Sequence, residues 1–190
     1  MSYIPTASQT VGPFFNFGLT TDANLGKLAG PEAEGERIRL SFRVIDGDGA
    51  PAPGDAMIEL WQADSAGRYQ HPADARAGDP KSFHGFGRME TDLDGRCTFE
   101  TIKPGRVPAP DGSLQAPHIN VLVFARGLLR HLHTRVYFQG DPANAADPVL
   151  ALVPEQRRAT LLAQPCAGDP GARSCDIVLQ GDRETVFFDV

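Results

Sequence analysis

Cysteine is scarce in this sequence of 190 residues, and long apolar runs are absent. The three cysteines, Cys97, Cys166 and Cys175, are too few and odd in number for a disulfide framework, so we expect a reducing, cytoplasmic environment. No stretch reaches the ~18 consecutive apolar residues that a membrane-spanning helix needs. Residues 1–17 lack the basic and apolar regions of a secretory signal peptide.

Basic charge is also in short supply. The chain has 18 Lys and Arg against 24 Asp and Glu, a net charge of -6. A surface of that sign repels phosphate backbones, which argues against a nucleic-acid partner. The 20 glycines and 16 prolines argue against a long-helix or coiled-coil protein, because both residues destabilise helix interiors.

Several common catalytic motifs are missing. The sequence has no Gly-x-Ser-x-Gly, no glycine-rich phosphate loop, no Cys-x-x-Cys and no His-Glu-x-x-His. Carboxylate pairs such as Asp92 and Asp94 fall in turn sequences, where aspartate is common because its side chain hydrogen-bonds the backbone of the turn. The sequence therefore gives little support to a serine hydrolase, a nucleotide-binding protein or a zinc protein.

Alternating apolar and polar residues separated by turns are what the chain does contain. Between Arg37 and Ile45 every second side chain is apolar, a pattern typical of a half-buried strand. We expect one all-β domain over residues 1–190, a β-sandwich core with long irregular loops and one short helix. The expected strands are 37–45, 56–62, 97–102, 118–126, 131–138, 175–180 and 185–190, the helix is 155–163, and the loops are 63–88 and 104–117.

We expect the first 30 residues to form an N-terminal arm. Residues 8–17 combine a rigid Gly12-Pro13 pair with two aromatic side chains, Phe14 and Phe15. Alone, such an arm would not offset its ordering entropy. We expect it to pack on its own body or on a partner.

Histidine and tyrosine give the candidate chemistry. His131 and His133 fall on one strand face, either as a two-histidine metal clamp or as two satisfied strand residues. His118 shares a face with Asn120, whose neutral amide is a poor ligand for a trivalent ion. Tyr69, in a polar loop, would suit Fe³⁺ as a tyrosinate or is simply a surface residue.

Arg126 ends the most apolar predicted strand, on the same face as His118 and Asn120. It is either a surface charge or a guanidinium aimed at a carboxylate.

Eight motifs in this order resemble one family, the intradiol ring-cleavage dioxygenases, and within it the alpha subunits of the alpha–beta members that act on protocatechuate. The resemblance covers residues 8–190. The motifs are Ser8-Gln9-Thr10-Val11-Gly12-Pro13, Glu59-Leu60-Trp61-Gln62-Ala63-Asp64, Gly67-Arg68-Tyr69, Lys103-Pro104-Gly105, Ala116-Pro117-His118-Ile119-Asn120, Phe124-Ala125-Arg126-Gly127, His131-Leu132-His133-Thr134-Arg135-Val136-Tyr137-Phe138 and Glu184-Thr185-Val186-Phe187-Phe188-Asp189.

The resemblance implies a large alpha–beta assembly whose beta subunit binds one non-haem Fe³⁺ through two tyrosines and two histidines. In this sequence the four ligand positions fall at Tyr69, Val107, His118 and Asn120, and the position of the family's catalytic arginine falls at Gln115. Valine has no donor atom, and two ligands from one chain do not hold Fe³⁺. The resemblance therefore implies a vestigial site, with no metal bound and no catalytic residue in this chain.

The resemblance also implies that Thr10, Gly12, Pro13 and Arg126 border the substrate pocket of the beta subunit. The implied reaction cleaves protocatechuate with O₂ to 3-carboxy-cis,cis-muconate, in the beta-ketoadipate route of aromatic catabolism. Two alternatives stay open: a β-sandwich binding module without an enzymatic role, and a self-sufficient intradiol dioxygenase.

Overall fold

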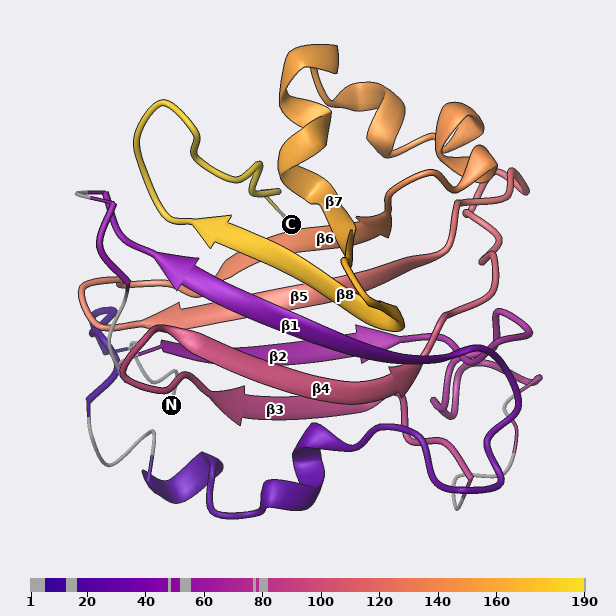
Figure 1. Cartoon of the computed structure of the whole chain (residues 1–190), viewed down its shortest axis with the longest axis horizontal. Helices are drawn as coiled ribbons and strands as arrows, with labels where there is room; N and C mark the ends of the chain where they lie inside the picture. Colours follow the sequence, from indigo (N-terminus) through magenta and orange to yellow (C-terminus); the bar gives the residue numbers. More distant parts are fainter. Residues whose placement is uncertain are drawn as a thin grey trace, which may run out of the picture.

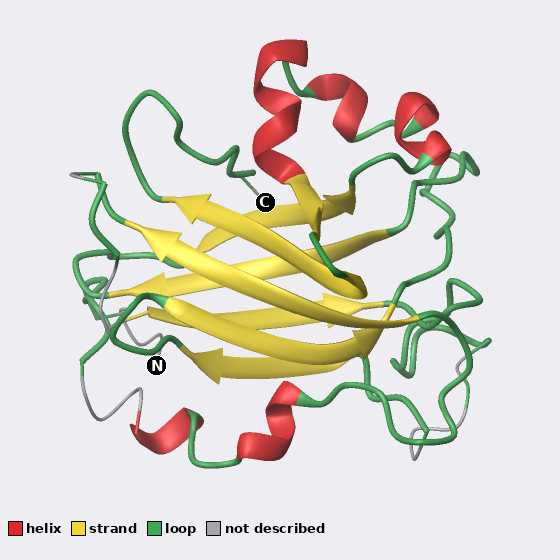
Figure 2. Ribbon diagram, in the orientation of Figure 1, coloured by secondary structure: helices red, strands yellow, loops and turns green. Residues whose placement is uncertain are grey.

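The computed structural model describes residues 6–12, 17–47, 49–51, 56–76, 78 and 82–189. These residues contain eight strands, four 3₁₀ helices and a helical segment at residues 17–19 (Figures 1 and 2). The strands are β1 (Arg37–Ile45), β2 (Ala56–Gln62), β3 (Phe86–Glu90), β4 (Arg96–Ile102), β5 (His118–Ala125), β6 (Leu132–Phe138), β7 (Leu162–Cys166) and β8 (Asp169–Val178). The helices are η1 (Ala23–Gly26), η2 (Pro142–Ala146), η3 (Leu150–Leu152) and η4 (Glu155–Leu161).

The strands form one folded-over sheet in the order β3-β2-β5-β6-β7-β8-β1-β4. Figure 1 shows β8, β1 and β4 in front of β5, β2 and β3, so the sheet makes two layers. The layers are joined along one side by two parallel residue pairs between β6 and β7, Tyr137 with Leu162 and Phe138 with Ala163. The predicted all-β, sandwich-like fold is confirmed.

The core lies between the two layers. In β1 the side chains of Ile38, Leu40, Phe42 and Val44 are buried, as the alternation predicts. They meet the inward side chains of β4, β8, β2, β5 and β6. Phe42 and Phe99 touch edge to face across this core, with ring centroids 6.0 Å apart. Burial of these alternating apolar residues provides most of the driving force for folding.

The C-terminal third carries more helix than predicted. The expected helix 155–163 is wrong in type and length: it is the 3₁₀ helix Glu155–Leu161, and residues 162 and 163 already belong to β7. Leu161 is buried, so the chain turns there into the sheet instead of adding another turn of helix. Helices η2 to η4 pack over the outer side of β6, at the top of Figure 1.

Four strand expectations differ from the structure by more than an end residue. β3 lies inside the predicted loop 63–88, β8 begins at Asp169 instead of residue 175, and β7 was not expected. In residues 185–189 the structure has an isolated bridge between Phe188 and His133, not the predicted strand. The pairing of β3 with β2 and of β7 with β6 joins segments well separated in sequence, which local patterning cannot reveal.

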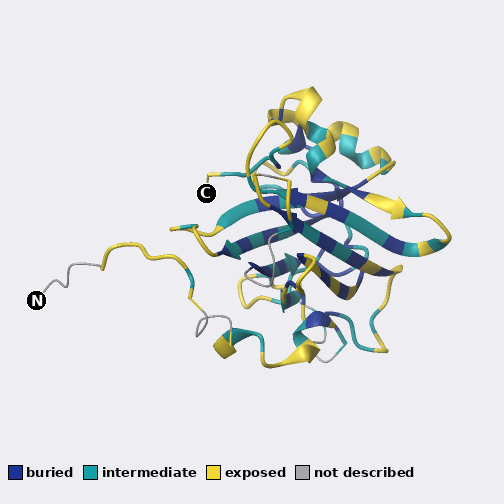
Figure 3. Cartoon of the chain, turned by 60° about the vertical axis from the view of Figure 1, so that its left-hand side comes forward, coloured by how far each residue is buried: buried dark blue, intermediate teal, exposed yellow. Residues whose placement is uncertain are grey.

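The N-terminal segment divides near Gly26. Residues 6–10 are exposed, and the start of this segment extends away from the body (Figure 3), while Thr10 is hydrogen-bonded to Gly127. Gly26 and Leu28 are buried, and Lys27 forms a bridge with Glu100 of β4. The free part of the expected arm is therefore shorter than residues 1–30. No helix in the described ranges is long and apolar enough to cross a membrane.

Replacing Phe42 by alanine should cost about 3–5 kcal/mol of unfolding free energy, because it leaves a cavity in the centre of the core. Leu93→Ala is the control, since that side chain is 83% exposed and its loss should change stability by less than ~0.5 kcal/mol. Urea unfolding of both variants measures the difference. Equal losses would contradict the assigned core.

Candidate functional site

Neighbouring polar residues on the outer face of β2, β5 and β6 form the candidate site. Trp61, Asn120 and Arg135 are paired in register across the three strands. The next register position places His118 opposite Tyr137. The inner face of the same strands is apolar, so the sheet holds these polar side chains on its outer surface at fixed spacing.

Tyr69 reaches this face from the loop after β2. Its ring stacks on Trp61, with centroids 5.8 Å apart and planes 8° from parallel. The Nδ2 of Asn120 donates to the Tyr69 hydroxyl oxygen at 3.5 Å and to the Trp61 carbonyl at 3.4 Å. Burial raises the pKa of the Tyr69 phenol, against the opposing effects of the Asn120 hydrogen bond and the charge of Arg135. Tyr69 is therefore a neutral phenol at neutral pH.

Two carboxylates fix the backbone beside Tyr69. Asp64 accepts from the Arg68 side chain at 2.7 Å, and Asp74 accepts from the Tyr69 backbone N–H at 3.0 Å. Gly67 has φ +74°, and a Cβ there would overlap the carbonyl oxygen of Arg106. The close approach of these two loops needs glycine at this position.

The loop before β5 contributes Val107 and Gln115. Val107 is 6% exposed, and its carbonyl accepts from the Gln115 backbone N–H at 2.9 Å. The Gln115 side-chain oxygen accepts from Nη1 of Arg135 at 2.7 Å. The valine thus contributes only hydrocarbon and its own carbonyl, and that carbonyl is already bonded.

His118 is buried, with 1% of its surface exposed. Its Nδ1 lies 2.8 Å from the carbonyl oxygen of Ala116, so Nδ1 carries the proton and Nε2 keeps a lone pair. Burial, together with the charge of Arg135, lowers the pKa of His118 to about 4. Metal-binding histidines are held in this same tautomer by a carbonyl.

Sequence reasoning missed three residues around His118. Arg135 and Tyr137 were named only as members of a motif, and Asp147 was not considered. Asp147 is 1% exposed and accepts from the Tyr137 hydroxyl at 3.0 Å and from the Ala116 backbone N–H at 2.7 Å. Tyr137 and Arg135 alternate with buried apolar residues in β6, a pattern that could have placed them on the outer face.

The donor set does not fit Fe³⁺. The structure brings Tyr69, His118 and Asn120 to one place, as the resemblance implies. However, the Tyr69 phenol is protonated, and Asn120 directs an N–H toward its oxygen. Fe³⁺ prefers anionic oxygen and imidazole. His118 alone has the form of a ligand. Among the described residues, no three His, Cys, Asp or Glu side chains gather as a metal site.

Thr10 and Arg126 meet at a different corner. Arg126 lies in the turn after β5, where the next residue, Gly127, has φ +92° and donates its N–H to the Thr10 hydroxyl at 2.7 Å. Gly12 is exposed and has open space beside its α-carbon, and Pro13 lies outside the described residues. A strand of this length separates Arg126 from His118 by about 25 Å, so the two corners cannot line one pocket within one chain.

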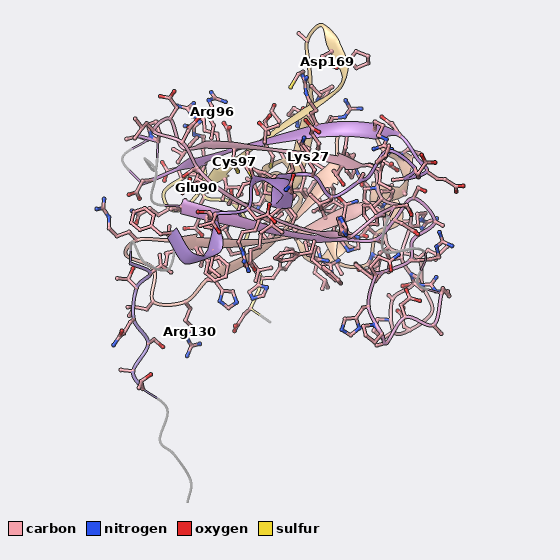
Figure 4. The ribbon with its side chains drawn as sticks, turned by 90° about the horizontal axis from the view of Figure 1, so that it is seen from below. Lys27, Glu90, Arg96, Cys97, Arg130 and Asp169 are labelled. Atoms are coloured by element: carbon pink, nitrogen blue, oxygen red, sulfur yellow. The ribbon has the colours of Figure 1, made fainter. Side chains whose placement is uncertain are left out.

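A groove of about 200 Å³ lies beside this corner. Gln9 and Val11 form one wall, and residues of the β5–β6 turn from Phe124 to His131 form the other. Arg130, labelled in Figure 4, lies on this wall, on the side of the molecule where the N-terminal segment leaves the body. The arm therefore contacts its own chain through residues 9–11.

His131 and His133 lie together, as the spacing predicts. Their Nε2 atoms are 2.7 Å apart, so one ring donates a hydrogen bond to the other. Phe124 packs on His131, with ring centroids 5.1 Å apart. The pair is satisfied internally, which favours the structural alternative over the metal clamp.

Known proteins resemble this chain along nearly its whole length. A family model described as Dioxygenase matches residues 10–181. The protocatechuate 3,4-dioxygenase alpha chain of Burkholderia cepacia is 48% identical, with 97% of both chains covered. The corresponding beta chain from the same organism is 36% identical, with 85% of this chain and 68% of that one covered.

The solved structure of 3-chlorocatechol 1,2-dioxygenase from Rhodococcus opacus has the same fold, with a TM-score of 0.63 at 21% identity. That comparison covers 94% of this chain and 69% of the other.

Buried His118 should make stability depend on pH. Its pKa is about 4 when folded and about 6.5 when unfolded, so its contribution is complete above pH 6.5 and is lost as pH falls toward 4. Between pH 7 and pH 5 the wild type should lose about 2 kcal/mol more than His118→Asn, which keeps an N–H near the Nδ1 position. Urea unfolding at both pH values measures this, and equal losses would refute the assignment.

Proposed function

Because the chain belongs to the intradiol dioxygenase family, we propose that it acts as the non-metal-binding alpha chain of a protocatechuate 3,4-dioxygenase. Its similarity to such an alpha chain covers 97% of both sequences. The observation that carries the proposal is the donor set around His118, where hydrocarbon and an amide replace two ligands. The fold has been kept while the metal site has been lost, as expected of a subunit whose partner performs the chemistry.

The proposed reaction is protocatechuate plus O₂ giving 3-carboxy-cis,cis-muconate, with both oxygen atoms retained in the product. This step belongs to the beta-ketoadipate route of aromatic catabolism. A non-haem Fe³⁺ held by the beta chain supplies the Lewis acid and oxygen chemistry. The low cysteine content supports a cytoplasmic location.

The corner of Thr10, Gly12 and Arg126 is the proposed contribution of this chain to the partner's pocket, together with Pro13. The Thr10–Gly127 hydrogen bond holds the arm against the turn that carries Arg126. An arginine presents a planar pair of N–H donors that matches a carboxylate. Its distance from His118 is consistent with a pocket completed by a second chain instead of by this one.

Co-expression with a beta chain tests the proposal. The isolated chain should bind no stoichiometric iron and consume no O₂ with protocatechuate, and the alpha–beta complex should do both. Tyr69→Phe should leave the iron content of the complex unchanged, because the phenol is not a ligand. Ring cleavage by the isolated chain would support a self-sufficient enzyme, and a beta chain fully active without this partner would support a binding module.

Arg126→Ala in the complex should lower kcat/KM for protocatechuate by about tenfold to a hundredfold. A loss of this size corresponds to the free energy that one charge-assisted hydrogen bond contributes. The loss for catechol, which lacks the carboxylate, should be much smaller. Arg130→Ala is the matched control, since it removes a neighbouring arginine on the same wall of the groove. Equal losses for the two substrates would remove Arg126 from the carboxylate site.

A further inference from the structure

Arg135 lies at the centre of the vestigial site. It projects from the outer face of β6, directly across from Asn120 of β5. Its Nη1 donates to the Gln115 side chain at 2.7 Å, and Tyr137 lies two residues further along the same strand. Its positive charge acts on both Tyr69 and His118. One guanidinium is thus close to both surviving ligand positions.

The charge of Arg135 is permanent. A guanidinium is not deprotonated in proteins, so its charge persists beside any second cation. The side chains around it include a phenol, an imidazole and two amides. The nearby carboxylate of Asp147 already accepts from the Tyr137 hydroxyl and from the backbone N–H groups of Ala116, Val149 and Leu150. In a partly buried site of low dielectric constant, two adjacent cations repel more strongly than they would in water.

We propose that Arg135 itself keeps metal out of this pocket, in addition to the missing donors at Val107 and Asn120. Its side chain is bonded to Gln115, on the strand face that also carries Asn120 and His118. Its positive charge opposes any metal ion bound there. Restoring the two donors is therefore not sufficient to rebuild a metal site while Arg135 is present. This inference concerns the chain alone and does not depend on the substrate or partner of the assembly.

The test compares three variants of the full-length chain. Val107→Tyr/Asn120→His restores the donors and keeps Arg135. A triple variant adds Arg135→Gln, which removes the charge but keeps a hydrogen-bonding side chain beside Gln115. The matched control adds Arg135→Lys, which keeps a positive charge. All are made in a His131→Gln background, which is not counted in these names and which breaks the exposed histidine pair as a competing site.

Each protein is incubated anaerobically with Fe²⁺, oxidised in air and dialysed. Iron content and the visible tyrosinate-to-iron absorption are then measured. The Arg135→Gln triple variant should retain about one iron per chain and be coloured, and the donor-only and Arg135→Lys proteins should retain less than about a tenth of that. Equal iron content in the donor-only and Arg135→Gln proteins, high or low, would overturn the proposal.

A second comparison covers the case in which the multiple variants do not fold. Single Arg135→Gln and Arg135→Lys substitutions, in the His131→Gln background, leave Tyr69 and His118 in place. The probe is Cu²⁺, because protein sites bind it more strongly than the other divalent ions of the first transition row. Arg135→Gln should bind it at least about tenfold more tightly than Arg135→Lys, and equal affinities would contradict the role of the charge. Neither assay uses the partner chain, so failure here is distinct from failure of the proposed function.

Discussion

A fixed positive charge on the outer face of β5 and β6 is the constraint on which the chemistry of this chain depends. The guanidinium of Arg135 is bonded to the Gln115 amide, and its charge acts on the phenol of Tyr69 and the imidazole of His118. The nearby Asp147 carboxylate is already engaged by the Tyr137 hydroxyl and the Ala116 backbone N–H. The carbonyl oxygen of Ala116 holds His118 in the tautomer that leaves Nε2 with a lone pair. The chemistry of the pocket is that of a filled and hydrogen-bonded surface.

Strand β5 separates the two parts of the molecule that matter for function. The vestigial pocket lies at its first residue, and the corner of Thr10 and Arg126 lies just past its last. A rigid strand in the middle of a layer keeps these two places about 25 Å apart. The residues that we propose as this chain's contribution to the partner's pocket therefore lie far from the incomplete donor set around His118, which fits the proposal that another chain supplies the reacting centre.

Much of the fold could be predicted because its signals are local. The alternation in β1 and β5 gave the buried faces correctly, and the Asp and Gly turns gave most strand ends. β3 and β7 could not be predicted, since each is short and pairs with a strand well before it in the sequence, β3 with β2 and β7 with β6. The site was predictable where a motif carries it, as at Tyr69 and His118. The role of Arg135 was not, because it follows from pairing with Asn120 across two strands.

The position of iron in a crystal of the alpha–beta complex tests the account most directly. Diffraction data collected on both sides of the iron absorption edge locate the metal without reference to activity. The account predicts one anomalous peak for each alpha–beta pair, within the partner chain, and none between the side chains of Tyr69 and His118. A peak of comparable height in that pocket would contradict it.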